Sequence, residues 1–161
     1  MPDKEMYPKI HNAAWPGLVG KEPGTDHPPI DLETMAKMTA DAKVNGRSFD
    51  GIDLFLSVPH IPIDSSKDEI KAVADKIGNL GLAVGTLVAP IWPPTGGGSA
   101  MGSDTEKKRF LDAVEKSCKI GQWLKELGIR SYGHIRIDSA TSVDVWAKAP
   151  EENQKLIAET F

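Results

Sequence analysis

A pattern that repeats along the chain constrains its fold more than any other feature: a short apolar strand, a loop, an amphipathic helix, then a glycine before the next strand. Strands that alternate with helices form parallel βαβ units with right-handed crossovers. The sequence therefore predicts an α/β fold in a single domain, residues 1–161. Strands are predicted at residues 9–13, 51–58, 82–89 and 129–137, and helices at 32–43, 66–80, 103–127 and from 150 onward.

Capping residues predict where the helices begin, and glycines predict where they end. Asp31 is expected to accept hydrogen bonds from free N–H groups at the start of the first helix. Asn45-Gly46 is expected to end that helix, because glycine takes the left-handed conformation at little cost. The later helices have two capping boxes and two glycine stops: Ser66 with Glu69, Ser103 with Glu106, Gly81 and Gly128.

The faces of the strands distinguish an open doubly wound sheet from a closed barrel. In the fourth strand, His134, Arg136 and Asp138 share one face, and Ile135 and Ile137 share the other. Central strands of a doubly wound sheet are apolar on both faces, because helices cover both. One apolar and one polar face favours a (β/α)8 TIM barrel, in which the polar face lines the interior. Four strands cannot close such a barrel, so we expect the chain to supply about the first four βα units.

The sequence has a start signal for the last predicted helix but no stop signal. Pro150 suits its first position, and Leu156, Ile157 and Phe161 continue the apolar stripe to the final residue. An interrupted helix is the simpler interpretation, and the chain is expected to be truncated or partial at its C-terminus. A homo-oligomer or a missing C-terminal half would then complete the barrel.

The composition and charge of the chain limit the classes of partner that we expect it to bind. The net charge is −4, and no basic stripe of the kind that binds a nucleic acid backbone is visible, so no nucleic acid partner is expected. No apolar run approaches the ~20 residues that cross a bilayer, and the N-terminus has no signal-peptide core, so no membrane partner is expected. The single cysteine, Cys118, lies in an apolar helical pattern and is predicted to be a buried structural thiol. These features predict a cytoplasmic protein.

The candidate ligand-binding residues lie at the carboxyl ends of the predicted strands, within them, or in the loops that follow. In barrels, the chemistry is carried by those ends and loops. Imidazole, carboxylate and guanidinium groups can hydrogen-bond hydroxyls, and aromatic rings can stack on a sugar face. The candidates are His11, Trp15, Asp53, His60, Trp92, Arg136 and Asp138.

Several of these candidates also have a structural interpretation. His11 could be a satisfied structural histidine, and His60 is as compatible with a plain surface position as with a site. Trp15 and Trp92 could pack against their own loops.

The charged residues of the strands have structural interpretations as well. Asp53 lies inside an apolar strand and needs a partner, because an unpaired buried carboxylate is costly. Arg136 is the expected partner, and a structural ion pair is slightly favoured over direct substrate binding. Asp138 could cap the next turn. His134, deeper in its strand, is interpreted as a member of a packing or hydrogen-bond network rather than as a ligand residue.

No short motif assigns a cofactor. The chain has no HExxH, no CxxC and no histidine pair at metal-ligand spacing. The glycines at 96–98 lack the spacing of a phosphate-binding loop and are interpreted as a mobile loop over the strand ends. No metal ligand and no catalytic residue can be assigned from these residues.

The runs YPKIHNAAWPGLVG, FDGIDLFLSVPH, LAVGTLVAPIW and YGHIRIDSATSVDVWA resemble the N-terminal half of sugar phosphate isomerase/epimerase-type proteins. These belong to the xylose isomerase-like TIM-barrel superfamily. The resemblance covers nearly the whole chain and rests on the element order and the strand endings. It implies that His11, Asp53 and Trp92 shape a pocket for a small sugar or polyol.

The resemblance also implies a reaction and a cofactor. Such enzymes move a proton between adjacent carbons, and a divalent Mn, Co, Mg or Zn ion polarises the substrate oxygens. In the family, the metal ligands lie mainly on strands five to eight, so none is carried over to this chain. The alternatives are a non-catalytic half-barrel that binds a partner and, less favoured, a metal-dependent endonuclease of the same fold.

Overall fold

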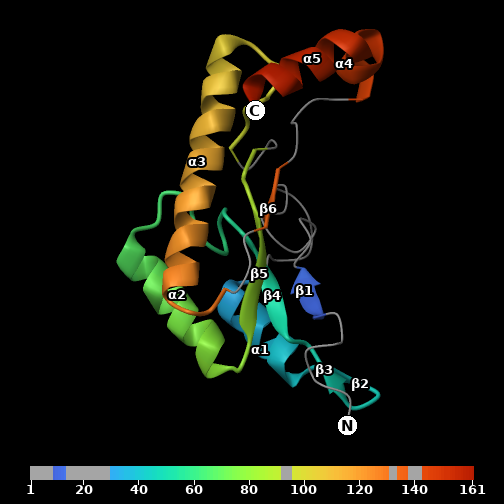
Figure 1. The fold of residues 1–161 in the computed structure, drawn as a ribbon. Coiled ribbons are helices and arrows are strands. Elements are labelled where there is room, and N and C mark those ends of the chain that lie inside the picture. The colour runs from blue at the N-terminus through green and yellow to red at the C-terminus, as the bar shows by residue number, and fades with distance from the viewer. Residues whose placement is uncertain (1–8, 14–29, 92–95, 131–133, 138–142) are drawn as a thin grey trace.

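The computed structural model describes residues 9–13, 30–91, 96–130, 134–137 and 143–161 of the chain (Figure 1). Strands and helices alternate through most of these residues. In chain order the elements are β1 (His11–Ala13), α1 (Leu32–Asp41), β2 (Lys43–Val44), β3 (Arg47–Ser48), β4 (Gly51–Phe55), α2 (Lys67–Asn79), β5 (Ala83–Val88), α3 (Asp104–Glu126), β6 (Ile135–Arg136), α4 (Val143–Lys148) and α5 (Pro150–Thr160).

The main sheet has four strands in the order β1-β4-β5-β6, and every pair in it is parallel. In Figure 1, α2 and α3 run together along one side of this sheet. Helix α1 packs on β4, and α3 packs on β5 and β6. The α/β fold with a parallel sheet that the sequence predicts is therefore confirmed.

The core lies between the sheet and these helices. Ile52 and Leu54 of β4 and Val84 and Leu87 of β5 are fully buried. Side chains alternate across a strand, so Asp53 points to the opposite face of the sheet. The sheet thus has an apolar face toward the helices. Helix side chains complete this core: Met35, Ala36, Ile70, Ile77, Ile120 and Leu124.

The helix caps form as the sequence predicts. The Asp31 carboxylate accepts a hydrogen bond of 2.7 Å from the Thr34 N–H. Both predicted capping boxes are present, at the starts of α2 and α3. Gly81 and Gly128 follow these two helices, each with a φ of 74°, where glycine avoids the steric penalty of a Cβ. Pro150 occupies the first position of α5, also as predicted.

The predicted end of the first helix is wrong. Helix α1 ends at Asp41, and the next residues form an antiparallel hairpin of β2 and β3. Asn45 and Gly46 make its two-residue turn, with φ values of 51° and 77°. A turn with two positive φ angles matches the right-handed twist of paired strands, so Asn-Gly here specifies a hairpin rather than a helix stop.

The fourth predicted strand is much shorter than expected. Strand β6 covers only Ile135–Arg136, although the Ile129 carbonyl still accepts from the Val84 N–H at 3.0 Å. Between these points, the side chain of Arg130 donates to the Gly85 carbonyl at 3.1 Å. The guanidinium thus contacts the main chain of β5 close to the point where Ile129 pairs with it.

The predicted burial of the Cys118 thiol is wrong. Cys118 is exposed, and Leu111 of the same helix, α3, is 48% exposed. Ser117 is buried beside Cys118, and its hydroxyl donates to the Ala113 carbonyl of its own helix at 2.6 Å. A hydroxyl satisfied in this way can occupy an apolar interface. No helix in the described part of the chain is long and apolar enough to cross a membrane.

The hairpin turn gives a first testable expectation. Gly46→Ala should lower the free energy of unfolding by about 1–2 kcal/mol, because a left-handed conformation is unfavourable for a residue with a Cβ. No atom of the described residues lies within 4 Å of a Cβ placed there, so the cost is conformational. Urea denaturation measures it, with Gly78→Ala inside α2 as the control. A Gly46→Ala variant with an unchanged free energy of unfolding would contradict the hairpin turn.

Candidate functional site

A row of polar side chains crosses the sheet on the face opposite the helices. The His11 Nδ1 atom lies 3.3 Å from Asp53 Oδ1, and the Thr86 N–H donates to the same oxygen at 2.8 Å. The Thr86 hydroxyl lies 3.3 Å from His134 Nδ1. We call His11, Asp53, Thr86 and His134 the polar row. One of these residues lies on each of β1, β4 and β5, and His134 immediately precedes β6.

The partner of Asp53 differs from the prediction. Its carboxylate contacts His11 and the Thr86 N–H rather than Arg136. The strand order explains the difference, because His11 lies on β1, directly beside β4, whereas β5 lies between β4 and the strand of Arg136. Arg136 also pairs with Val88, which pairs with Phe55, so it lies two residues nearer the carboxyl end of the sheet than Asp53. Asp53 thus contacts His11 in place of the expected ion pair with Arg136.

A bulge in β5 makes room for this arrangement. Ile52 pairs with Val84 and Leu54 pairs with Leu87, so β5 has one more residue than β4 between the two pairs. The extra residue lies at Gly85 or Thr86. A Cβ on Gly85 would collide with the His11 ring and the Asp53 carboxylate. Glycine is required here for the close approach of side chains, and the bulge turns the Thr86 N–H toward Asp53.

A cavity of about 580 Å³ lies over the same face. Its volume is in the range of small-molecule sites. Asp53 lines it, and its Oδ2 atom accepts no hydrogen bond from the described residues, since both contacts use Oδ1. The cavity therefore combines an unused carboxylate oxygen with polar and apolar groups. Its lining is Ala13, Asp53, Phe55, Thr86, Val88, His134, Ile135, Arg136 and Ile137.

His60 lies behind this cavity rather than on the surface. It is 7% exposed, and its ring meets Phe55 edge-on, with 6.4 Å between ring centroids. Neither ring nitrogen has a hydrogen-bond partner among the described residues. Burial lowers the pKa of His60, partly offset by the Ile30 carbonyl and the Asp31 carboxylate, and so favours the neutral imidazole. The surface interpretation of His60 is wrong.

The other predicted site residues divide into two groups. Arg136 is exposed and lines the cavity with Asp53, and His134 belongs to a hydrogen-bond network as the sequence suggests. Trp15, Trp92 and Asp138 lie outside the described residues, so their predicted roles are not tested.

Two residues of the site escape prediction from the sequence. Thr86 stands in the strand run LAVGTLVA, where a threonine is compatible with any half-buried β position. Its neighbour Gly85 carries the only visible signal, because an isolated glycine within a strand often marks a bulge or a close approach. Register then decides which side chain is approached, and the register is not visible in the sequence.

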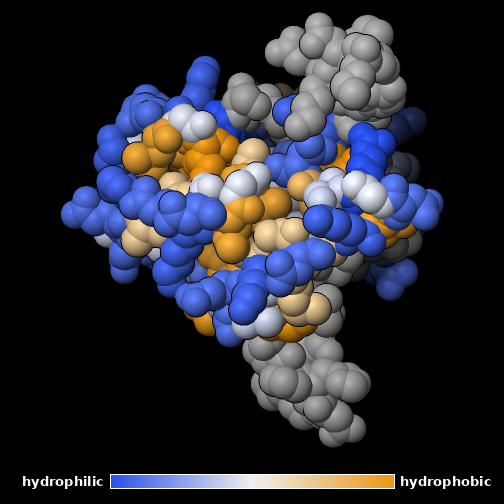
Figure 2. Space-filling view, turned by 90° about the horizontal axis from the view of Figure 1, so that it is seen from below, coloured by the Kyte–Doolittle hydropathy of each residue, from blue (hydrophilic) through white to orange (hydrophobic). Residues whose placement is uncertain are grey.

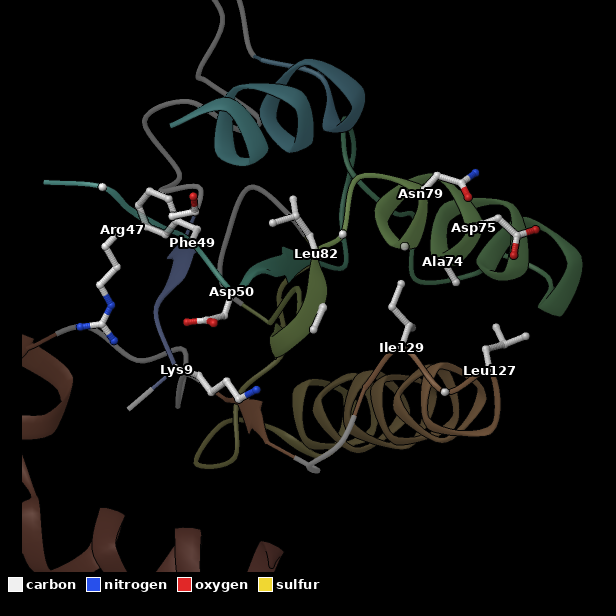
Figure 3. A pocket seen from close by; sticks show the side chains of 16 residues that line it. Lys9, Arg47, Phe49, Asp50, Ala74, Asp75, Asn79, Leu82, Leu127 and Ile129 are labelled. Carbon is white, nitrogen blue, oxygen red and sulfur yellow. The ribbon is translucent and has the colours of Figure 1, made fainter. Parts of the chain in front are cut away.

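A larger concavity of about 1080 Å³ lies at the other end of the sheet (Figure 3). Lys9, Arg47 and Asp50 line one part of it, and Leu82 and Ile129 another. Figure 2 views the molecule from below, where hydrophobic residues gather within a hydrophilic rim. None of the predicted site residues lines this concavity, which lies where the strands begin. We favour the cavity that lies over the polar row because Ala13, Phe55 and Val88, the last residues of β1, β4 and β5, line it, and parallel strands carry chemistry at their carboxyl ends.

The divalent cation implied by the resemblance does not fit the described residues by themselves. They contain no group of three His, Cys, Asp or Glu side chains that could hold a metal ion. Asp53 also commits one carboxylate oxygen to His11 and Thr86. No step is therefore derived through a metal on these residues.

Comparison with known protein families and with curated proteins finds no family model and no relative that matches the chain. The resemblance to sugar phosphate isomerase/epimerase-type proteins therefore stays a prediction, and the site must be interpreted from its own geometry.

The close approach at Gly85 can be tested directly. Gly85→Ala should destabilise the chain by about 1–3 kcal/mol, because the added methyl group overpacks against His11 and Asp53. Urea denaturation gives the loss, and the imidazole NMR signals of His11 should move. Gly78→Ala is the matched control, because a Cβ there meets Ile129 at an ordinary 3.6 Å. Equal behaviour of the two variants would contradict the packing of the polar row.

Proposed function

We propose that this chain forms part of the substrate pocket of a sugar or polyol isomerase or epimerase built on a TIM barrel. The observation that carries the proposal is the Asp53 carboxylate beside the cavity, because the described residues contact its Oδ1 atom and none of them donates to its Oδ2 atom. A carboxylate fixed in this way can accept hydrogen bonds from sugar hydroxyls.

The order of the strands supports the barrel. Each strand of the main sheet lies beside the next parallel strand along the chain, without the reversal that a doubly wound sheet has at its switch point. The helices of the first three crossovers supply the apolar core on one face, and the polar row occupies the other. Eight such strands close a barrel, so the described four would supply about half of one.

The chemistry of the cavity supports a polyhydroxylated ligand. Asp53 and Thr86 offer oxygen acceptors, His134 offers imidazole nitrogens, and Arg136 offers N–H donors. Phe55, Val88, Ile135 and Ile137 add apolar groups to the lining. Few apolar ligands would use so many hydrogen-bonding groups, so a sugar or polyol is favoured.

The proposed role of the described residues is to bind and orient the substrate. Asp53 would position one hydroxyl, and the His11 contact would keep the carboxylate in one rotamer. A bound divalent cation would polarise the substrate oxygens in an enzyme of this kind. The groups that move the proton are not assigned to residues of this chain.

Ligand binding tests the proposed pocket. Asp53→Asn should weaken sugar binding by about 10- to 150-fold, because a hydrogen bond to a charged group contributes about 1.5–3 kcal/mol. NMR titration with pentoses, hexoses and their phosphates measures it. Asp75→Asn is the control, since Asp75 lines the concavity at the other end of the sheet. Weaker sugar binding by Asp75→Asn, together with unchanged sugar binding by Asp53→Asn, would place the ligand at the other end of the sheet and contradict the proposal.

The isolated 161-residue chain should not isomerise any of these sugars, with or without added Mn²⁺, Co²⁺, Mg²⁺ or Zn²⁺. The reason is that the described residues offer no three-ligand metal group. A coupled or chromatographic assay for sugar interconversion checks this. Turnover by the metal-loaded chain would refute the division of roles proposed here, whereas absence of any sugar binding would favour a non-catalytic half-barrel that binds a partner.

A further inference from the structure

A buried arginine lies on the helix side of the sheet, directly behind the polar row. Arg130 is 5% exposed, and its Nε atom donates to the Gly85 carbonyl at 3.1 Å. Its Nη2 atom donates to the His134 carbonyl at 2.6 Å. On the side of α3, a Cβ placed on Gly121 would lie 2.7 Å from Nη1. The guanidinium thus fills the space that a glycine leaves between α3 and the sheet.

The two carbonyls that Arg130 holds belong to the residues that shape the polar row. Gly85 is the close-approach glycine of the β5 bulge, immediately before Thr86, whose N–H donates to Asp53. His134 is itself a member of the row and lies 3.3 Å from the Thr86 hydroxyl. Arg130 therefore contacts the backbone of His134 and of Gly85, the residue that precedes Thr86.

We propose that Arg130 is a positioning residue for the interior pocket. Its planar guanidinium fixes the spacing between the Gly85 and His134 carbonyls, and this sets where Thr86 and His134 meet on the opposite face. Lysine could not reproduce the contact, since its ammonium is a single point rather than a rigid fork of donors. The inference rests on the proposed function only in taking the cavity as the ligand site.

Gly121 of helix α3 leaves the space that the Arg130 guanidinium occupies. An alanine in the middle of a helix normally stabilises it by up to about 1 kcal/mol relative to glycine. At Gly121 the added methyl group would press on the guanidinium, whose end must shift. A substitution that favours the helix should therefore disturb the polar row on the far side of the sheet.

The test compares Gly121→Ala with Gly78→Ala, a helical glycine of α2 where a Cβ has an ordinary contact. In Gly121→Ala, the Thr86 amide should exchange its hydrogen about fivefold faster, as expected when a hydrogen bond worth about 1 kcal/mol is weakened. The imidazole signals of His134 should move, and sugar affinity should fall by a similar factor. Gly78→Ala should change none of these quantities.

Arg130→Lys provides the second variant, because it keeps the charge and removes the fork. It should reproduce the changes of Gly121→Ala at the Thr86 amide and the His134 ring. Unchanged signals in both variants, or shifted signals with unchanged sugar affinity, would overturn the inference. If the unsubstituted chain binds no sugar but the signals still move, the proposed function fails while the positioning of Thr86 and His134 by Arg130 stands.

Discussion

The rest of the candidate site depends on a carboxylate placed in the middle of a parallel sheet. Asp53 keeps 21% of its side chain exposed, and the part of a carboxylate that folding withdraws from water costs free energy unless it is hydrogen-bonded. The chain meets this demand with an imidazole from one neighbouring strand and a main-chain N–H from the other. The N–H is free for this purpose because β5 bulges, and the bulge fits because its residue is Gly85. The Asp53 carboxylate thus accounts for a histidine on β1 and for a glycine at the bulge of β5.

Much of the fold could be predicted from the sequence, because the signals are local. A capping box joins residues three apart, and the glycine that follows a helix needs no knowledge of the rest of the molecule. The same locality explains the main error. Asn45-Gly46 fits a helix stop and a hairpin turn equally well when considered alone. The two flanking strands have only two residues each, too few to show an alternating pattern.

The site was predicted only in part, because its contacts depend on register. The sequence indicates that Asp53 needs a partner, and Arg136 is the partner expected from it. The choice of His11 over Arg136 follows from the strand order, because β1 adjoins β4 and β6 does not. The role of Arg130 was hidden in another way. Its position in the sequence is compatible with a continuous strand, and only the fold shows that its side chain donates to the Gly85 carbonyl.

The polar row also bears on the choice between an open sheet and a closed barrel. In a doubly wound sheet, helices would cover the row, and His11, Asp53 and His134 would each need a partner from an apolar helix face. Here the row satisfies much of its own hydrogen bonding along the sheet and faces a cavity with Arg136. A sheet that keeps charged groups on one face and aliphatic groups on the other is suited to enclosing a polar ligand. The distribution in β4 and β5 is therefore consistent with the proposed barrel and with the proposed sugar pocket, since both require a polar interior.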